Sequence, residues 1–130
     1  MKNPEALAKM HEMAPFSFLA TAEGDQPCLR AMTHYIDEEL HIWYPSVKDC
    51  GKVRQMLANP KVAVSFFYTT YGGPPLTVYG TAEIIEDETI CREIWEHYGA
   101  SIAGIVPEGP GSGNFVVIKI TPGESVNNTY

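Results

Sequence analysis

Three residues in the first half of the chain have the side-chain chemistry of a phosphate site: Arg30, Ser46 and Lys52. Ser46 and Lys52 stand at the predicted start of a helix, where unpaired backbone N–H groups and the helix dipole attract an anion. Arg30 lies on a neighbouring predicted strand, and its planar guanidinium can hold two phosphate oxygens together. Lys48 precedes Lys52 by four residues, so both ammonium groups can lie along one helix edge. The alternative is a capped helix with solvated lysines, which is common in globular proteins.

The charge balance favours a small anion over nucleic acid. The chain has 16 acidic and 9 basic residues and a formal net charge of -7, whereas a nucleic-acid-binding domain is usually basic. Five of the basic residues fall within residues 30–61, while residues 62–130 are strongly acidic. We therefore expect no nucleic-acid partner, and the cationic stretch is either a site for a small anion or a solvated helix face.

The other reactive side chains form no recognisable metal or nucleophile motif. Cys28, Cys50 and Cys91 lie far apart without a CxxC pair, so we expect reduced thiols and neither a disulfide nor a zinc site. The four histidines show no HxH or HExxH spacing, and we predict no metal. His34 shares a strand face with Arg30 and is either an acid–base group or an ordinary strand histidine. Cys50 is either a reactive thiol or a small passive residue, so the catalytic residue remains unknown.

The hydrophobic pattern predicts one domain over residues 1–130, mainly β in the α+β class. No apolar run approaches the roughly 20 residues of a membrane-spanning helix, and no signal-peptide core is present, so we expect a cytoplasmic protein without membrane contact. Gly80 predicts a bulge or the close approach of another backbone or a ligand. An opening helix is expected at 4–13 and a loop at 104–113. Six strands of a small antiparallel barrel are expected at 16–22, 28–36, 40–44, 62–68, 76–85 and 115–120.

Local capping signals predict two further helices. Ser46, with Asp49 three residues later, is similar to a capping box, and Asn59 before a proline ends this helix. Asp87 can cap a later helix, which carries apolar residues every three or four positions and ends at Gly99. These helices flank the barrel and place Lys52 near the strand that carries Arg30.

Three segments resemble the pyridoxamine 5'-phosphate oxidase-like flavoproteins. They are FSFLATAEGDQPCLRAM, LHIWYPSVKDCGKVRQMLANPKVAVSFF and LTVYGTAEIIED, followed by an amphipathic helix, and they cover about residues 14–98. The resemblance implies the FMN-binding fold of that family, a six-stranded antiparallel split β-barrel with flanking helices. It also implies a homodimer that holds FMN at its interface.

The same resemblance assigns cofactor-binding residues. It implies that Arg30, Ser46 and Lys52 bind the FMN phosphate. The segment Ala31, Met32 and Thr33 would run beside the isoalloxazine ring, and Trp43 and Tyr44 would lie near the flavin and its ribityl chain.

Two departures from the family pattern bear on function. Cys50 stands where the family often has serine, which removes one hydroxyl near the phosphate and weakens binding by about 1 kcal/mol. The C-terminal ITPGESVNNTY lacks the Arg-x-His element with which the true oxidase binds its substrate. We therefore expect a related FMN-dependent oxidoreductase with an unknown substrate, in which flavin N5 exchanges a hydride or electrons. The alternatives are the same fold with a deazaflavin or haem, and a flavin-binding or sensing protein without turnover.

Overall fold

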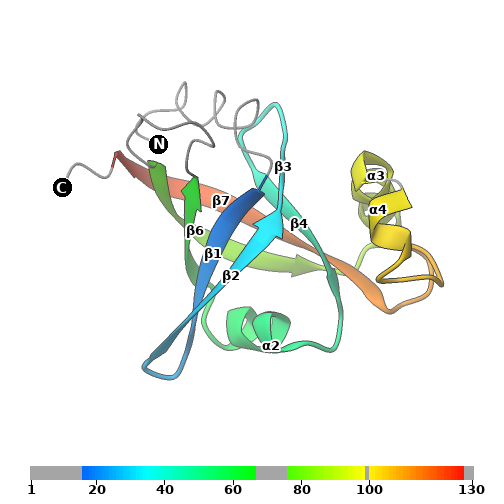
Figure 1. The fold of residues 1–130 in the computed structure, drawn as a ribbon, viewed down its shortest axis with the longest axis horizontal. Coiled ribbons are helices and arrows are strands. Elements are labelled where there is room, and N and C mark those ends of the chain that lie inside the picture. Colours follow the sequence, from blue (N-terminus) through cyan, green and yellow to red (C-terminus); the bar gives the residue numbers. More distant parts are fainter. Residues whose placement is uncertain (1–15, 67–75, 99, 128–130) are drawn as a thin grey trace.

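The chain folds around a curled antiparallel sheet (Figure 1). The computed structural model describes residues 16–66, 76–98 and 100–127, and in these ranges the sheet has seven strands in the order β2-β1-β5-β6-β7-β4-β3. The strands are β1 (Phe16–Glu23), β2 (Gln26–Thr33), β3 (Tyr35–Ile36), β4 (Ile42–Val47), β5 (Lys61–Phe66), β6 (Leu76–Ile85) and β7 (Phe115–Asn127). The helices are α2 (Gly51–Ala58), α3 (Glu88–Tyr98) and α4 (Ala100–Ala103). The helix predicted at 4–13 lies outside the described residues.

The mainly β split barrel is confirmed, but the described sheet has one strand more than the six predicted. The segment 28–36, predicted as one strand, is divided at His34 into β2 and β3. Its two parts have different partners, because β2 pairs with β1 whereas β3 pairs with β4. Consecutive strands therefore form the two edges of the sheet, and the barrel is split between them.

The side-chain alternation in β2 agrees with the prediction. Arg30 and Met32 are half-buried on the inner face, whereas Leu29, Ala31 and Thr33 are exposed on the other. Because successive side chains of a strand point to opposite faces, Arg30 is directed toward the barrel and α2 while Ala31 is directed away from them. This places the guanidinium where helix α2 can reach it.

The predicted start of the middle helix was wrong. Ser46 lies within β4, where it pairs with Val116, and Cys50 is the N-cap residue of α2. The strand can continue through Pro45 because β4 pairs there with β7 alone. No described strand on the other side of β4 needs a hydrogen bond from the N–H group that proline lacks. Ser46 therefore reaches the helix start from the adjacent strand and does not cap it.

Two other local predictions are confirmed. Asp87 accepts a hydrogen bond of 3.0 Å from the N–H of Ile90 at the start of α3. Gly80 lies at a register shift between β6 and β7, and a Cβ atom there would lie 2.7 Å from the carbonyl oxygen of Thr121. The shift lets β7 continue to Asn127, beyond the predicted end at residue 120.

The apolar side chains form two cores on the two faces of the sheet. The barrel interior includes Leu19, Tyr44 and Phe66, which are fully buried. A second cluster, which includes Trp43 and Ile94, packs α3 and α4 against β4 and β7. None of the described helices has both the length and the apolar character needed to cross a bilayer.

Candidate functional site

A cavity of about 330 Å³ lies where β2, β4, α2 and the α3–α4 segment meet. It collects five of the eight predicted cofactor residues from three separate elements: Ala31, Met32, Thr33, Ser46 and Lys52. Its other described lining residues are Pro45, Val47, Tyr98, Ile102 and Ile105. The cavity therefore has an apolar wall and one polar end.

Lys52 supplies the positive charge at the polar end. It is the only charged side chain among the described lining residues, and no described carboxylate lies within 4.0 Å of its ammonium group. Its Nζ donates to Cys50 Sγ at 3.5 Å, and Ser46 Oγ lies 3.4 Å from the same sulfur. The first turn of α2 also carries no acidic residue. An anion would therefore meet a cation, a hydroxyl and a helix N-terminus here.

The surroundings of the Cys50 thiol lower its pKa. Partial burial raises its pKa, but hydrogen bonds with Ser46 and the Val53 N–H, together with the Lys52 charge, lower it further than burial raises it. The net pKa lies below the ordinary value of a cysteine. The lowered pKa favours the prediction of a reactive thiol over that of a passive residue.

Arg30 is held next to this helix by neutral acceptors. Its Nη1 donates to Thr21 Oγ1 at 2.7 Å and to the Leu19 carbonyl oxygen at 3.3 Å, while Nη2 donates to Gln55 Oε1 at 2.9 Å. A guanidinium has five N–H donors, and none of these acceptors is a carboxylate. Within the described residues, Nε–H and one Nη2–H of Arg30 have no acceptor, so both can serve an external anion.

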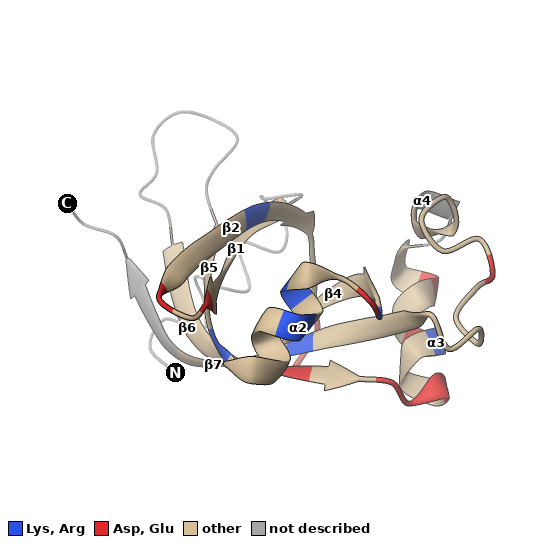
Figure 2. Ribbon diagram, turned by 90° about the horizontal axis from the view of Figure 1, so that it is seen from below, with Lys and Arg blue, Asp and Glu red and all other residues tan. Residues whose placement is uncertain are grey.

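Three other cations of the described chain, Lys48, Arg54 and Arg92, form ion pairs with nearby acids. Figure 2 shows basic residues on β2 and α2, and on α3 it shows acidic residues close to a basic one. Ion pairs of 2.5, 3.1 and 2.7 Å join Lys48 to Glu86, Arg54 to Asp49 and Arg92 to Glu88. Lys48 is thereby directed away from the cavity, contrary to the expectation that it could share an edge with Lys52.

Trp43 and Tyr44 lie in the two cores and not among the cavity-lining residues. Tyr44 is fully buried, its hydroxyl lies 2.5 Å from Ser17 Oγ, and burial raises its pKa far above the ordinary value. Trp43 packs toward α3, and its Nε1 donates to Asp37 Oδ2 at 2.8 Å. Their predicted contacts with the flavin and ribityl chain remain predictions.

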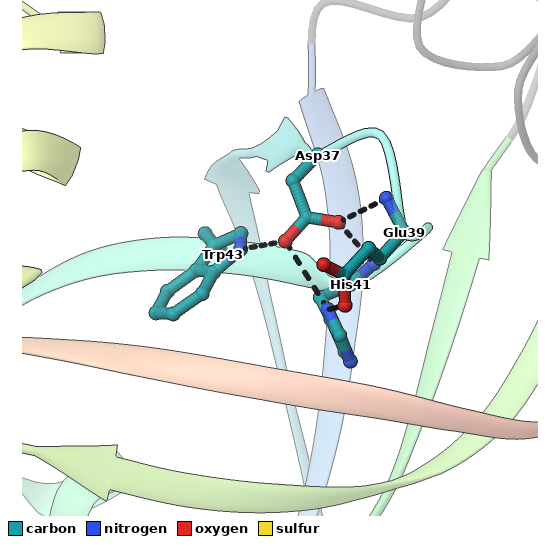
Figure 3. A network of polar contacts seen from close by, with 4 residues as sticks. All are labelled: Asp37, Glu39, His41 and Trp43. Carbon is teal, nitrogen blue, oxygen red and sulfur yellow. Dashed lines mark hydrogen bonds and ion pairs between the residues drawn. The ribbon is translucent and has the colours of Figure 1, made fainter.

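Asp37 fixes the turn that carries Trp43 (Figure 3). Its Oδ1 accepts hydrogen bonds from the backbone N–H groups of Glu39 and His41, both at 2.9 Å. Its Oδ2 accepts from Trp43 and also lies 3.2 Å from His41 Nδ1. Partial burial raises the pKa of Asp37, but the hydrogen bonds from Trp43 and His41, together with the His41 charge, bring it below the ordinary value.

His34 is part of a buried hydrogen-bonded group. Its side chain is 8% exposed, and Nδ1 lies 3.0 Å from Ser17 Oγ, which also contacts the Tyr44 hydroxyl. The three residues come from β1, the β2–β3 junction and β4, so they join the strands across the split of the barrel. His34 is absent from the described cavity lining, which favours the ordinary histidine over the acid–base group.

The sequence patterns missed residues that support the site through contacts between distant segments. Thr21 and Gln55 hold Arg30, and Tyr98 places its hydroxyl 3.2 Å from the Thr33 carbonyl and 3.1 Å from the Trp43 carbonyl. Burial, followed by the nearby Tyr44, raises the pKa of Tyr98, so its hydroxyl stays protonated as a donor. Gln55 follows Lys52 by one helical turn, a spacing that could have indicated a shared face.

Comparisons with known proteins agree with this architecture. The family model described as pyridoxamine 5'-phosphate oxidase matches residues 4–127. A comparison with curated proteins gives no significant match. A solved structure of a candidate pyridoxamine 5'-phosphate oxidase from Listeria innocua is 33% identical, covers 94% of each chain and has a TM-score of 0.78.

Two more distant structures share the fold. One is a pyridoxamine 5'-phosphate oxidase-related, FMN-binding protein from Nostoc punctiforme, 11% identical, covering 96% of this chain and 83% of that chain, with a TM-score of 0.76. The other is an F420 reductase, 23% identical, covering 96% and 99% of the two chains, with a TM-score of 0.72. With the family match over nearly the whole sequence, the chain belongs to the pyridoxamine 5'-phosphate oxidase family.

Proposed function

We propose that this protein binds FMN and is an FMN-dependent oxidoreductase. The observation that carries the proposal is Lys52, which lines the cavity without an acidic partner among the described residues. Arg30 is not among the described lining residues, but it lies on the strand that supplies three of them and is held by neutral acceptors alone. The chain has a net charge of -7, but cations without a carboxylate partner still create a local positive potential, which attracts an external anion. The terminal phosphate of FMN has the charge and oxygen geometry that this donor set requires.

The proposed roles follow from the donors of each residue. Arg30 uses its two remaining N–H donors, and Lys52 its ammonium, to hold phosphate oxygens. The Ser46 hydroxyl, which donates to the Val47 carbonyl oxygen at 3.0 Å, turns to offer the same hydrogen to the ligand. The backbone of Ala31 to Thr33 lies along the cavity where a flat ring system can pack.

The bound FMN would supply the hydride or electron transfer. The protein contributes orientation and a partly dry environment, since Met32, Ile102 and Ile105 give the cavity an apolar wall. The Tyr98 hydroxyl contacts the backbone carbonyls of Thr33 on β2 and Trp43 on β4, and so fixes the position of α3 beside these two strands.

We also propose that the protein is a homodimer. Leu29 on the edge strand β2 is 68% exposed, and Ile105 at the cavity rim is 66% exposed, so apolar side chains remain uncovered around the site. A second copy would cover them and complete the cofactor site. Sedimentation at low micromolar concentration tests this proposal, and a stable 14.4 kDa species would reject it.

The identity of the cofactor is tested by the absorbance spectrum of the purified protein and by mass spectrometry of the ligand released on denaturation. We expect a flavin spectrum and the mass of FMN. A deazaflavin is the second candidate, because one relative of the same fold is an F420 reductase. Release of a deazaflavin or of haem, or no binding of added FMN, would contradict the proposal.

A further inference from the structure

The amide of Gln55 connects the proposed phosphate cation to helix α2. Its Oε1 accepts two hydrogen bonds, one from Arg30 Nη2 at 2.9 Å and one from the Thr21 hydroxyl at 2.6 Å. Thr21 in turn accepts from Arg30 Nη1 at 2.7 Å. The guanidinium is therefore fixed on two sides, by a strand and by the helix that carries Lys52.

The opposite end of the same amide faces an acid. Gln55 Nε2 donates to Glu23 Oε2 at 3.4 Å, so the amide lies between a cation and a carboxylate. Only the amide orientation with oxygen toward Arg30 and nitrogen toward Glu23 suits both neighbours, since a guanidinium only donates and a carboxylate only accepts. Glu23 is thereby held by Gln55 and forms no ion pair with Arg30 among the described contacts.

A neutral acceptor and a charged acceptor have different consequences for anion binding. A carboxylate at position 55 would form an ion pair with Arg30 and cancel much of its charge, so a phosphate would have to compete for the guanidinium. An amide accepts the same hydrogen bond but leaves the full positive charge available. The contacts of Arg30 are all of this neutral kind: a hydroxyl, a carbonyl and an amide oxygen.

We propose that Gln55 is a positioning residue of the cofactor site, whose neutral amide orients Arg30 for a phosphate without neutralising its charge. The inference rests on the proposed binding of FMN, because Gln55 acts through Arg30 and its own donors face Glu23. It assigns a function to a residue that is not among the described lining residues of the cavity. Gln55→Glu keeps the hydrogen-bond acceptor and the side-chain length but adds a negative charge. A positioning role therefore predicts weaker FMN binding in this variant, whereas a purely structural role predicts no selective effect on FMN.

The test is a fluorescence titration of the apoprotein with FMN and with riboflavin, which lacks the phosphate, at fixed ionic strength. Gln55→Glu is expected to weaken FMN binding by about tenfold or more, the effect of losing one hydrogen bond to a charged group. Riboflavin binding is expected to stay within about twofold, since Arg30 acts on the phosphate alone. Gln55→Ala, which leaves Arg30 charged but less ordered, should lower FMN affinity by a smaller factor.

Asn59→Asp is the matched control, because it makes the same amide-to-acid change four residues later, at the C-cap of α2. Its Oδ1 accepts from the N–H of Lys61, which a carboxylate can also do, and it does not contact Arg30. We expect it to leave the ratio of FMN to riboflavin affinity within about twofold of wild type, because the added charge is only half-buried, is partly screened and has no contact with Arg30.

The outcomes separate this inference from the proposed function. If Arg30→Ala abolishes the preference for FMN over riboflavin but Gln55→Glu retains it, the positioning role is rejected and the phosphate site stands. Equal losses of FMN affinity in Gln55→Glu and Asn59→Asp would also reject the positioning role, since the added negative charge alone would then explain both. If the wild type binds FMN and riboflavin equally, the phosphate site and the inference both fail. If Gln55→Glu does not fold, the ratio of FMN to riboflavin affinity in Gln55→Ala decides. A lowered ratio supports the positioning role, and an unchanged ratio rejects it.

Discussion

The indole N–H of Trp43 donates a hydrogen bond of 2.8 Å to the carboxylate of Asp37, which also accepts the backbone N–H groups of Glu39 and His41. This carboxylate replaces water for several donors of the turn between β3 and β4. Leu40 in the same turn has a φ of 67°, so its backbone is held in the left-handed region that non-glycine residues rarely adopt. The strained turn thus depends on one anionic side chain.

Replacing this carboxylate is expected to destabilise the fold. Asp37→Ala should lower the free energy of unfolding by about 2 kcal/mol, because it removes hydrogen bonds to a charged group and leaves their donors unpaired. The adjacent Glu38→Ala is the control, since Glu38 is exposed and should change stability by less than about 0.5 kcal/mol. Urea unfolding followed by tryptophan fluorescence measures both, and equal values for the two variants would contradict the role of Asp37.

The stabilisation by Asp37 should also depend on pH. Its pKa is lower in the folded protein than in the unfolded chain, so its contribution is fully present above about pH 4, the ordinary aspartate pKa. The contribution is lost as the pH falls through the folded pKa. The difference in unfolding free energy between wild type and Asp37→Asn should therefore shrink between pH 6 and pH 2. A difference that stays constant over this range would show that the charge of Asp37 contributes nothing.

The Cys50 thiol should lose reactivity when its cation is removed. Lys52→Met is expected to raise the pKa of Cys50, because the ammonium charge and its contact at 3.5 Å favour the thiolate. Alkylation of Cys50 by iodoacetamide at pH 7.5, followed by peptide mass spectrometry, should then be slower than in the wild type. Lys48→Met serves as the control, since Lys48 pairs with Glu86. A similar rate in all three proteins would rule out the assigned influence of Lys52.

The elements with strong local signals could be predicted from the sequence. The alternation around Arg30 gave the correct faces of β2, Asp87 marked the start of α3, and Gly80 marked the bulge between β6 and β7. Each of these features depends on a local backbone requirement: a two-residue period, a capping acceptor, or a close approach that only glycine permits.

What the sequence patterns missed depends on pairing between distant segments. Ser46 was predicted to cap a helix but is held in β4 by Val116, a partner seventy residues away in the chain. The break at His34 arises because the two halves of one apolar segment join opposite edges of the sheet. No local preference encodes either choice, and the contact of Gln55 with Arg30 likewise exists only after β1, β2 and α2 have packed together.

The central claim is that Arg30 and Lys52 hold the phosphate of FMN, and titration of the apoprotein with FMN and riboflavin tests it most directly. Arg30→Ala and Lys52→Ala should each weaken FMN binding by about 1.5–3 kcal/mol, the range for hydrogen bonds to charged groups, and leave riboflavin binding nearly unchanged. Lys48→Ala should have little effect, because Glu86 already neutralises Lys48. Unchanged FMN affinity in both Arg30→Ala and Lys52→Ala, or equal losses for FMN and riboflavin, would contradict the claim.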